Sequence, residues 1–279
     1  MFGKQVNARG LAAWTLAALT APAAQFFGSL PWVWVLEAGV GAGLLWVLVW
    51  KYGGPLPRAW AAAVLLGTVP ALLLSLRYSG ACWPGVPDGI QGWALLIFAA
   101  WAALRGSAAG TRYGAVVFCI SALAYGMLLA CALPGVKAEN LRPADTEALP
   151  WSLLVLLVPL GLSVLQKEES LRPWGWIGGG ALAAGLLAAV CAGVMGPARA
   201  AAMDGAFYNL VRSIRFFGVA ERFEALVSGI MTMGWFCYTT LILCIAGEAG
   251  ERLRKGTGRA ALCVAAGLTA TIYCFVGNI

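Results

Sequence analysis

The chain has 279 residues, of which 61% are apolar and only 11% charged, and its mean hydropathy is +0.81. A soluble domain carries about a quarter charged residues because water must wet its surface, so this composition excludes an ordinary soluble protein. The net charge of +7 does not indicate nucleic-acid binding, because the cations lie at the ends of apolar runs, where they set membrane topology. We expect one transmembrane domain over residues 1–279, with membrane lipid as the partner of most of its surface.

The residue types that carry most enzymatic chemistry are missing. The chain has no histidine, which removes the commonest general base and histidine-based nucleophiles and metal sites. No glycine-rich phosphate loop and no GxSxG motif occurs. The eight cysteines form no CxxC pair, and most lie in apolar segments, where small packing residues are expected. We therefore predict no catalytic residue, no metal site, no cofactor and no enzyme.

Apolar runs of roughly 20 residues are long enough to cross a hydrocarbon core, and several such runs occur along the chain. They predict an all-α, polytopic bundle of about nine spans, within a range of eight to ten. The predicted spans are residues 11–28, 31–50, 58–76, 90–105, 111–134, 148–165, 174–195, 223–246 and 259–276.

The first run has a second interpretation, as a signal peptide cleaved near Pro22-Ala23-Ala24. Apolar character continues through Phe26 and Phe27 into the second run, which favours a retained span. With the N-terminus inside, twelve lysines and arginines fall on the inner side and seven on the outer side. This bias predicts a multi-pass protein with an inner N-terminus and an outer C-terminus.

Residues 205–222 alternate apolar positions with Arg212, Arg215 and Arg222. This pattern predicts an amphipathic helix in the membrane interface, with its arginines toward the headgroups. Its role is either that of a simple connector or that of a gate or docking element.

Two spans contain residues that break helices. The first carries Thr20-Ala21-Pro22 with Gln25 near its outer end, and the sixth carries Pro159-Leu160-Gly161-Leu162-Ser163. Proline removes a backbone donor, and irregular backbone at depth persists only where protein or a water-filled cavity satisfies it. Paired interruptions of this kind form substrate and ion sites in secondary transporters, whereas two ordinary proline kinks would also explain them. The candidate ligand-binding residues are Thr20, Ala21, Pro22, Gln25, Pro159, Gly161 and Ser163.

Polar groups at membrane depth suggest an ion-coupling role. Glu37 lies inside the second span with no adjacent cation, and it would either hold a cation or proton there or reach the headgroup level. Thr239 and Thr240 place hydroxyls inside the eighth span, although threonine commonly bonds its own helix backbone.

Three stretches resemble the spore germination B-subunit permeases (GerAB-type) of the amino acid–polyamine–organocation transporter superfamily. They are Lys137–Pro143 after the fifth span, Phe207–Ile214 ahead of the eighth, and Glu221–Leu226 at the start of the eighth. The order and spacing of features over roughly residues 5–250 also agree with this family.

The resemblance implies an inverted-repeat, amino-acid-transporter-like fold with discontinuous first and sixth helices. It implies a permease-like subunit of a germinant receptor that senses a small nutrient, such as an amino acid, in the spore inner membrane or bacterial plasma membrane. A-type and C-type receptor subunits would be its partners. Two alternatives remain open: an ion-coupled amino acid transporter, and a non-binding membrane scaffold subunit, which the sparse polar lining of residues 150–163 favours.

Overall fold

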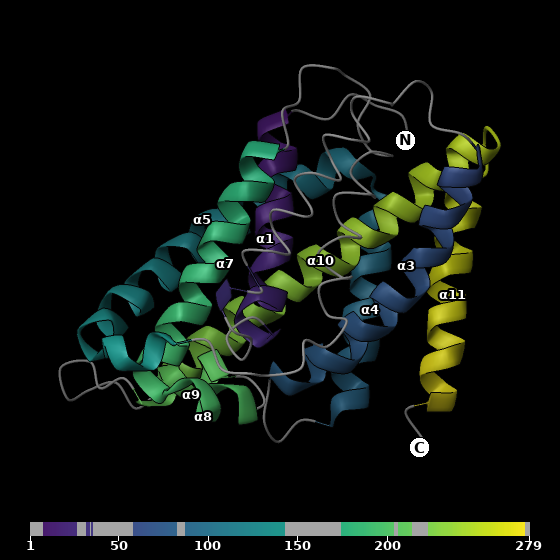
Figure 1. Cartoon of the computed structure of the whole chain (residues 1–279). Helices are drawn as coiled ribbons and strands as arrows, with labels where there is room; N and C mark the ends of the chain where they lie inside the picture. Colours follow the sequence, from purple (N-terminus) through teal and green to yellow (C-terminus); the bar gives the residue numbers. More distant parts are fainter. Residues whose placement is uncertain are drawn as a thin grey trace.

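The computed structural model describes residues 8–26, 32–33, 35, 58–82, 87–142, 174–203, 206–213 and 223–276, and every element within these ranges is a helix. The α-helices are α1 (Ala8–Phe26), α3 (Arg58–Ser79), α4 (Asp88–Leu104), α5 (Ser107–Ala132), α7 (Trp174–Met195), α8 (Pro197–Ala202), α9 (Ala206–Ser213), α10 (Phe223–Leu253) and α11 (Gly258–Val276) (Figure 1). Short 3₁₀ turns follow α3 and α5, namely η2 (Gly80–Cys82), η3 (Leu133–Gly135) and η4 (Ala138–Leu141).

Four of the described helices are long and apolar enough to cross a membrane: α3, α5 with η3, α10 and α11. Shorter apolar stretches lie in α4 and α7, over Gly89–Leu104 and Leu182–Met195. A helix of about 20 residues matches a hydrocarbon core about 30 Å thick. The all-helical fold and the long apolar helices support the membrane class that the composition predicts.

Seven of the predicted spans coincide with described helices. The span predicted at 174–195 matches α7 at both ends, and the others differ by a few residues except at the end of α10. The predicted spans 31–50 and 148–165 lie outside the described residues apart from residues 32–33 and 35. The count of nine and the inverted repeat therefore stay predictions.

The described helices run in two opposite directions, with α1, α3 and α5 sharing one of them. A side chain at Gly10 near the start of α1 would meet Thr111 near the start of α5, so these two helices run parallel. Gln25 near the end of α1 bonds Tyr78 near the end of α3, so α3 is parallel to both. Figure 1 shows α4 and α10 running the opposite way.

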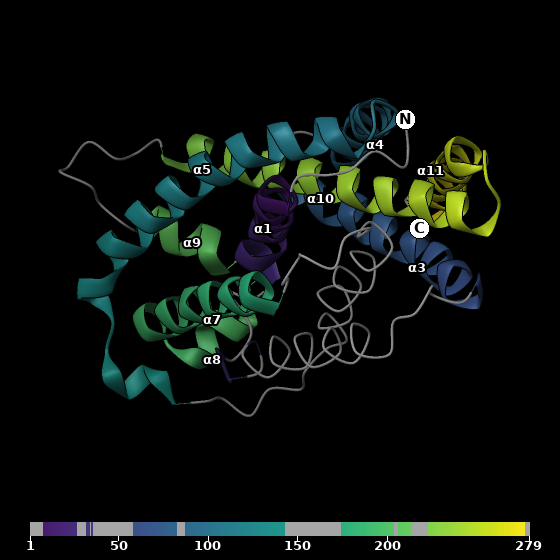
Figure 2. The ribbon, with the colours of Figure 1, turned by 90° about the horizontal axis from the view of Figure 1, so that it is seen from above.

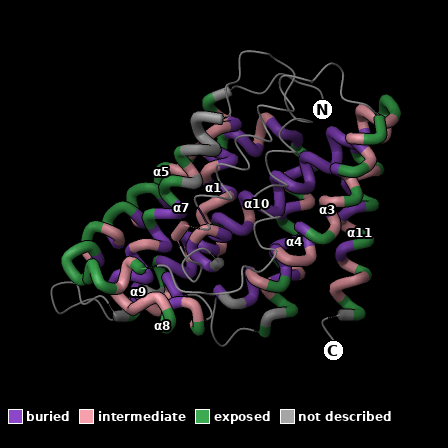
Figure 3. Tube along the Cα trace, in the orientation of Figure 1, coloured by how far each residue is buried: buried purple, intermediate pink, exposed green. Residues whose placement is uncertain are grey.

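The core of the bundle is α10. It contacts α1, α3, α4, α5, α9 and α11, and it lies between α3 on one side and α4 and α5 on the other (Figure 2). In its membrane-length stretch 78% of the residues are buried, against 22% in that of α11, which lies at the rim (Figure 3). Because α10 contacts more of the described helices than any other, its buried polar groups are placed against those of its neighbours inside the protein.

Large apolar side chains point outward from the rim helices. The most exposed are Leu66 on α3, Phe98 on α4, Leu123 on α5, Leu182 on α7 and Phe275 on α11, with exposed fractions of 62–76%. Many exposed large apolar side chains are expected where lipid is the solvent. These side chains mark the surface that the bilayer would cover.

The last turns of α10 extend beyond the predicted end at residue 246, to Leu253. The Glu251 carboxylate accepts hydrogen bonds from the backbone N–H groups of Gly256 and Gly258, at 2.9 and 3.1 Å, and so caps the first turn of α11. Gly256 has φ +85°, which favours glycine in this tight connection. The apolar run in the sequence stops before the end of α10, because polar residues continue this helix beyond its apolar stretch.

Within the predicted interfacial segment, Ala206–Ser213 forms α9, and residues 205 and 214–222 lie outside the described ranges. Phe207 and Leu210 are buried against the bundle, whereas Arg212 is exposed. The amphipathic pattern is present, and its position in the membrane interface stays a prediction.

Candidate functional site

The break predicted in the first helix is absent, so this expectation is wrong. α1 runs as one helix from Ala8 to Phe26 with Pro22 inside it. Pro22 lies one turn before the end of α1, so its missing N–H removes only the bond to the Ala18 carbonyl. The Thr20 hydroxyl donates to the Ala17 carbonyl at 2.7 Å, within the same helix. Proline near a helix end costs too little to unwind the backbone here.

The backbone of α10 fills the space beside the predicted ligand-binding residues of α1. A Cβ atom added at Gly234 would lie 2.8 Å from the Ala21 Cβ and 2.9 Å from the Thr20 hydroxyl oxygen. Ala21 itself is fully buried. Close helix contact through a small residue is the usual packing device in membranes. Thr20 and Ala21 therefore line a helix contact and not a hollow.

Gln25 joins three helices through its side-chain amide. Its Nε2 donates to the Tyr78 carbonyl of α3 at 3.0 Å, and its Oε1 accepts the Trp235 indole N–H of α10 at 2.9 Å. Gln25 is 8% exposed and Trp235 is fully buried. Both ends of the amide are thus used by protein groups, and Gln25 is a cross-link of the bundle.

The two threonines proposed for ion coupling bond within the protein. The Thr239 hydroxyl lies 2.8 Å from the Trp235 carbonyl of its own helix and 3.1 Å from the Ser75 hydroxyl of α3. Ser75 in turn donates to the Leu72 carbonyl at 2.7 Å, and Thr240 donates to the Phe236 carbonyl at 2.7 Å. Bonds of this type to the i−3 or i−4 carbonyl satisfy hydroxyls at membrane depth.

The remaining predicted site residues, Glu37, Pro159, Gly161 and Ser163, lie outside the described residues. The structure therefore does not bring the two halves of the predicted ligand site together or separate them. Their roles stay predictions.

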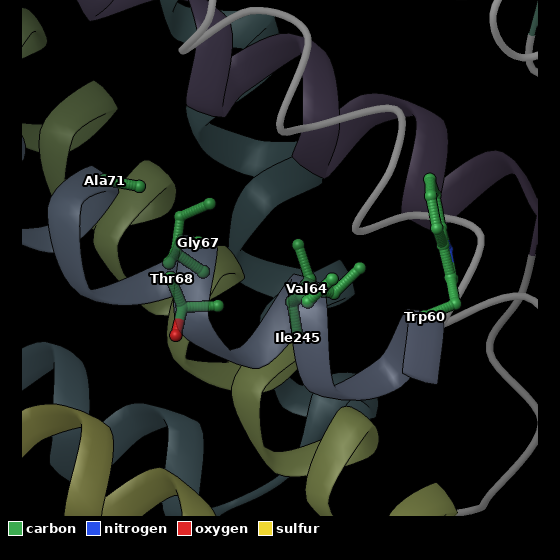
Figure 4. A pocket seen from close by; sticks show the side chains of 8 residues that line it. Trp60, Val64, Gly67, Thr68, Ala71 and Ile245 are labelled. Atoms are coloured by element: carbon green, nitrogen blue, oxygen red, sulfur yellow. The ribbon is translucent and has the colours of Figure 1, made fainter. Parts of the chain in front are cut away.

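A small cavity lies between α3 and α10, away from the predicted site residues. Its volume is about 90 Å³, and it is lined by Trp60, Ala63, Val64, Gly67, Thr68, Ala71, Ile242 and Ile245 (Figure 4). Among the described lining residues only Thr68 carries a hydroxyl, and it donates to the Leu65 carbonyl at 2.6 Å. None of these described lining residues carries a charge.

Sequence reasoning missed several of the polar groups that the fold buries. Glu248 on α10 is only 4% exposed and interacts electrostatically with Arg252, one turn on. The Glu–Arg spacing of four residues was its signal, but the span was predicted to end before it. Nothing in the sequence indicated that the indole N–H of Trp235 makes a polar contact, because tryptophan is counted among the apolar residues. Among the described residues no group of three or more His, Cys, Asp or Glu side chains could hold a metal ion.

The connector after α5, which carries the Lys137–Pro143 motif, is held against the C-terminal end of α7. The Lys137 backbone N–H and the Asn140 side-chain amide both donate to the Gly193 carbonyl at 3.0 Å. A Cβ atom at Gly193 would lie 2.6 Å from Val136, so the connector approaches too closely for a side chain there. The Leu141 carbonyl accepts the Trp32 indole N–H at 3.0 Å. In the described part of the chain this motif serves as a structural anchor.

No protein-family model matches the chain, and no curated protein matches it. The likeness to the germination permeases therefore rests on the three sequence stretches and on the order and spacing of features along the chain.

Proposed function

We propose that this chain is a permease-like, membrane-embedded scaffold subunit, in which polar groups at membrane depth join helices and do not bind a ligand. The observation that carries this proposal is the Gln25 amide, whose two ends are bonded to Tyr78 on α3 and Trp235 on α10. A ligand at this position would have to break both bonds inside a low-dielectric bundle, where unpaired polar groups are costly.

The surroundings of Gln25 support the same conclusion. Gly234 brings α10 against Thr20 and Ala21, so the first half of the predicted ligand site has no room for a solute. The Thr239 and Ser75 hydroxyls meet across α10 and α3. Polar contacts between buried helices specify which surfaces pair, and this is what a scaffold subunit requires of its membrane domain.

The resemblance to germination permeases supplies the assembly in which such a scaffold would act. Within this proposal, the chain holds A-type and C-type receptor subunits at the spore inner membrane. The connector over residues 137–142, one of the three stretches that carry the resemblance, is fixed to Gly193 of α7.

Thermal unfolding of the purified protein in detergent, with each of the twenty common amino acids added at millimolar concentration, tests this function. A ligand present at 100 times its Kd stabilises a protein by about 2.7 kcal/mol, which moves the midpoint measurably. We expect no amino acid to move it. A shift that one amino acid produces and its D-enantiomer does not would overturn the scaffold assignment.

A nutrient-sensing or transporting subunit is the second candidate, and one observation favours it. Pro22 has no amide hydrogen, so the carbonyl of Ala18, a fully buried residue of α1, lacks its helix partner. A freed carbonyl at membrane depth is a potential cation ligand in transporters. Under this alternative the substitution Pro22→Ala, which restores the N–H, would abolish cation-dependent uptake of a labelled amino acid into proteoliposomes. A sensor would bind the amino acid without accumulating it, and a scaffold would do neither.

A further inference from the structure

Four exposed basic side chains gather at one corner of the bundle. Arg254 and Lys255 lie in the turn between α10 and α11, Arg259 lies in the first turn of α11, and Arg58 is the first residue of α3. Figures 1 and 2 both show the start of α3 beside this turn, and α3 contacts α11. The first turns of α3 and α11 contain no acidic residue. This corner therefore presents concentrated positive charge at one end of the bundle.

The turn that carries Arg254 and Lys255 is held in one conformation by its own hydrogen bonds. The Glu251 carboxylate accepts two backbone N–H groups of the turn, at 2.9 and 3.1 Å. The Thr257 hydroxyl lies 2.7 Å from the Gly250 carbonyl oxygen and 2.6 Å from the Arg254 carbonyl oxygen. A fixed backbone lowers the entropy that is lost when the two exposed side chains bind a ligand.

A cavity whose described lining carries no charge begins next to this corner. The lining of the cavity between α3 and α10 starts at Trp60, two residues after Arg58, and follows one face of α3 to Ala71 (Figure 4). This stretch of helix rises about 16 Å, and half of a hydrocarbon core measures about 15 Å. The cavity thus has the length and the polarity that part of an acyl chain in one leaflet requires.

We propose that an anionic phospholipid binds at this corner, with its phosphate group on Arg58, Arg254 and Lys255 and part of one acyl chain in the cavity. Arginine binds phosphate through parallel N–H···O bonds, and lysine binds it as a point charge. Clustered basic residues beside a transmembrane helix attract anionic headgroups for this reason. A zwitterionic headgroup brings its own cation to the same place and gains less from the cluster. The lipid site does not depend on whether the chain is a scaffold.

Two cations at the other end of the bundle provide a matched comparison. Lys137 and Arg142 are exposed, and they flank η4, which carries Glu139. Because α3 and α5 are parallel and η4 follows α5, this pair lies at the opposite end from the start of α3. No residue of this connector belongs to the described lining of the cavity. Removing the pair changes the net charge as much as removing Arg254 and Lys255, without touching the proposed site.

The dependence of lipid binding on headgroup charge tests the proposal. Thermal unfolding of the full-length protein in a non-ionic detergent is measured while dioleoyl phosphatidylglycerol or dioleoyl phosphatidylcholine is added in increasing amounts. We expect the anionic lipid to raise the midpoint and the zwitterionic lipid to have little effect. Arg254→Gln with Lys255→Gln should weaken the apparent affinity for phosphatidylglycerol about 10–30-fold, and Lys137→Gln with Arg142→Gln should leave it within about twofold. Equal effects of the two lipids, or of the two double variants, would overturn the proposal.

Two further measurements separate a lipid from a soluble phosphate. Glycerol 3-phosphate has the phosphate of the headgroup without the chains, and we expect it to leave the midpoint unchanged. Ala63→Phe places a ring at an exposed position of the cavity lining and should weaken phosphatidylglycerol binding with every cation intact. Ala122→Phe, at an exposed position of α5, is its control. A glycerol 3-phosphate shift equal to that of the lipid, or full affinity of Ala63→Phe, would overturn the acyl-chain placement and with it the lipid site.

Discussion

The Trp235 indole donates a hydrogen bond of 2.9 Å to the Gln25 side-chain oxygen, across an interface between two helices that are 210 residues apart in the chain. The same amide bonds α3 through the Tyr78 carbonyl. Three helices that carry most of the buried surface are thus fixed by one glutamine.

Substituting Gln25 with leucine should lower the free energy of unfolding by about 1–3 kcal/mol, because the buried indole N–H of Trp235 and the carbonyl of Tyr78 lose their partner. Trp235→Phe should cost at least as much, since it also removes part of a buried ring. Detergent-titration unfolding measures both. The double variant should cost less than the sum of the two, and full additivity would contradict the bond.

Gly234→Ala should destabilise the protein, because its new Cβ would lie 2.8 Å from Ala21 on the facing helix. Gly229→Ala, also on α10, is the matched control, since nothing lies within 4 Å of the Cβ position there. The control should gain about 0.5–1 kcal/mol from helix propensity alone. Equal responses of the two variants in the same unfolding assay would mean that α1 and α10 are not in contact at Gly234.

Cys82 in η2 should resist alkylation in the folded protein. Burial raises the pKa of its thiol to about 12, which hydrogen bonding from Thr232 and Trp235 only partly opposes. At pH 8 almost none of it is thiolate, the reactive form. Mass spectrometry after treatment with N-ethylmaleimide should find Cys82 unmodified until detergent unfolds the chain.

The exposed Cys263 on α11 serves as the comparison for a membrane-permeant reagent. The raised pKa also sets a direction for stability: the folded state keeps a proton that the unfolded chain releases above pH 9.0, the ordinary pKa of a cysteine thiol. The contribution of the Cys82 thiol to the free energy of unfolding is therefore fully present below pH 9 and is lost as the pH rises towards 12. Rapid modification of Cys82 at pH 8 would show that η2 is not buried.

Asn140→Ala should loosen the connector between α5 and α7. The substitution removes the hydrogen bond of 3.0 Å to the Gly193 carbonyl, a loss of about 1 kcal/mol for a half-buried pair. Asn140→Asp should cost more, because a carboxylate would face that carbonyl oxygen. Limited proteolysis near Lys137 measures the loosening, with Lys255 in the α10–α11 turn as an internal reference. An unchanged cleavage rate in both variants would leave the anchor without a role.

The sequence located the described helices well, because each apolar run that it contains is long enough to form a helix of about the length that a bilayer holds. It did not locate the polar contacts, because these depend on which helix faces meet. Pro22 suggested a broken helix, yet its place near the end of α1 removes only one bond. Gln25 is a predicted ligand residue near the end of the first span, and the residues that its side chain bonds, Trp235 and Tyr78, lie far away in the chain. Glu248 was overlooked because helix α10 continues beyond its apolar stretch.

The distance along the chain between Gln25 and its indole partner has a consequence for biosynthesis. A ribosome that adds roughly 5–20 residues per second needs about 10–40 s to make the 210 residues between them. Throughout that interval α1 carries a side-chain amide whose oxygen lacks the partner that it has in the finished bundle. Nascent chains that stall before α10 would therefore present a recognisable polar defect to membrane chaperones and proteases, whereas finished chains would conceal it.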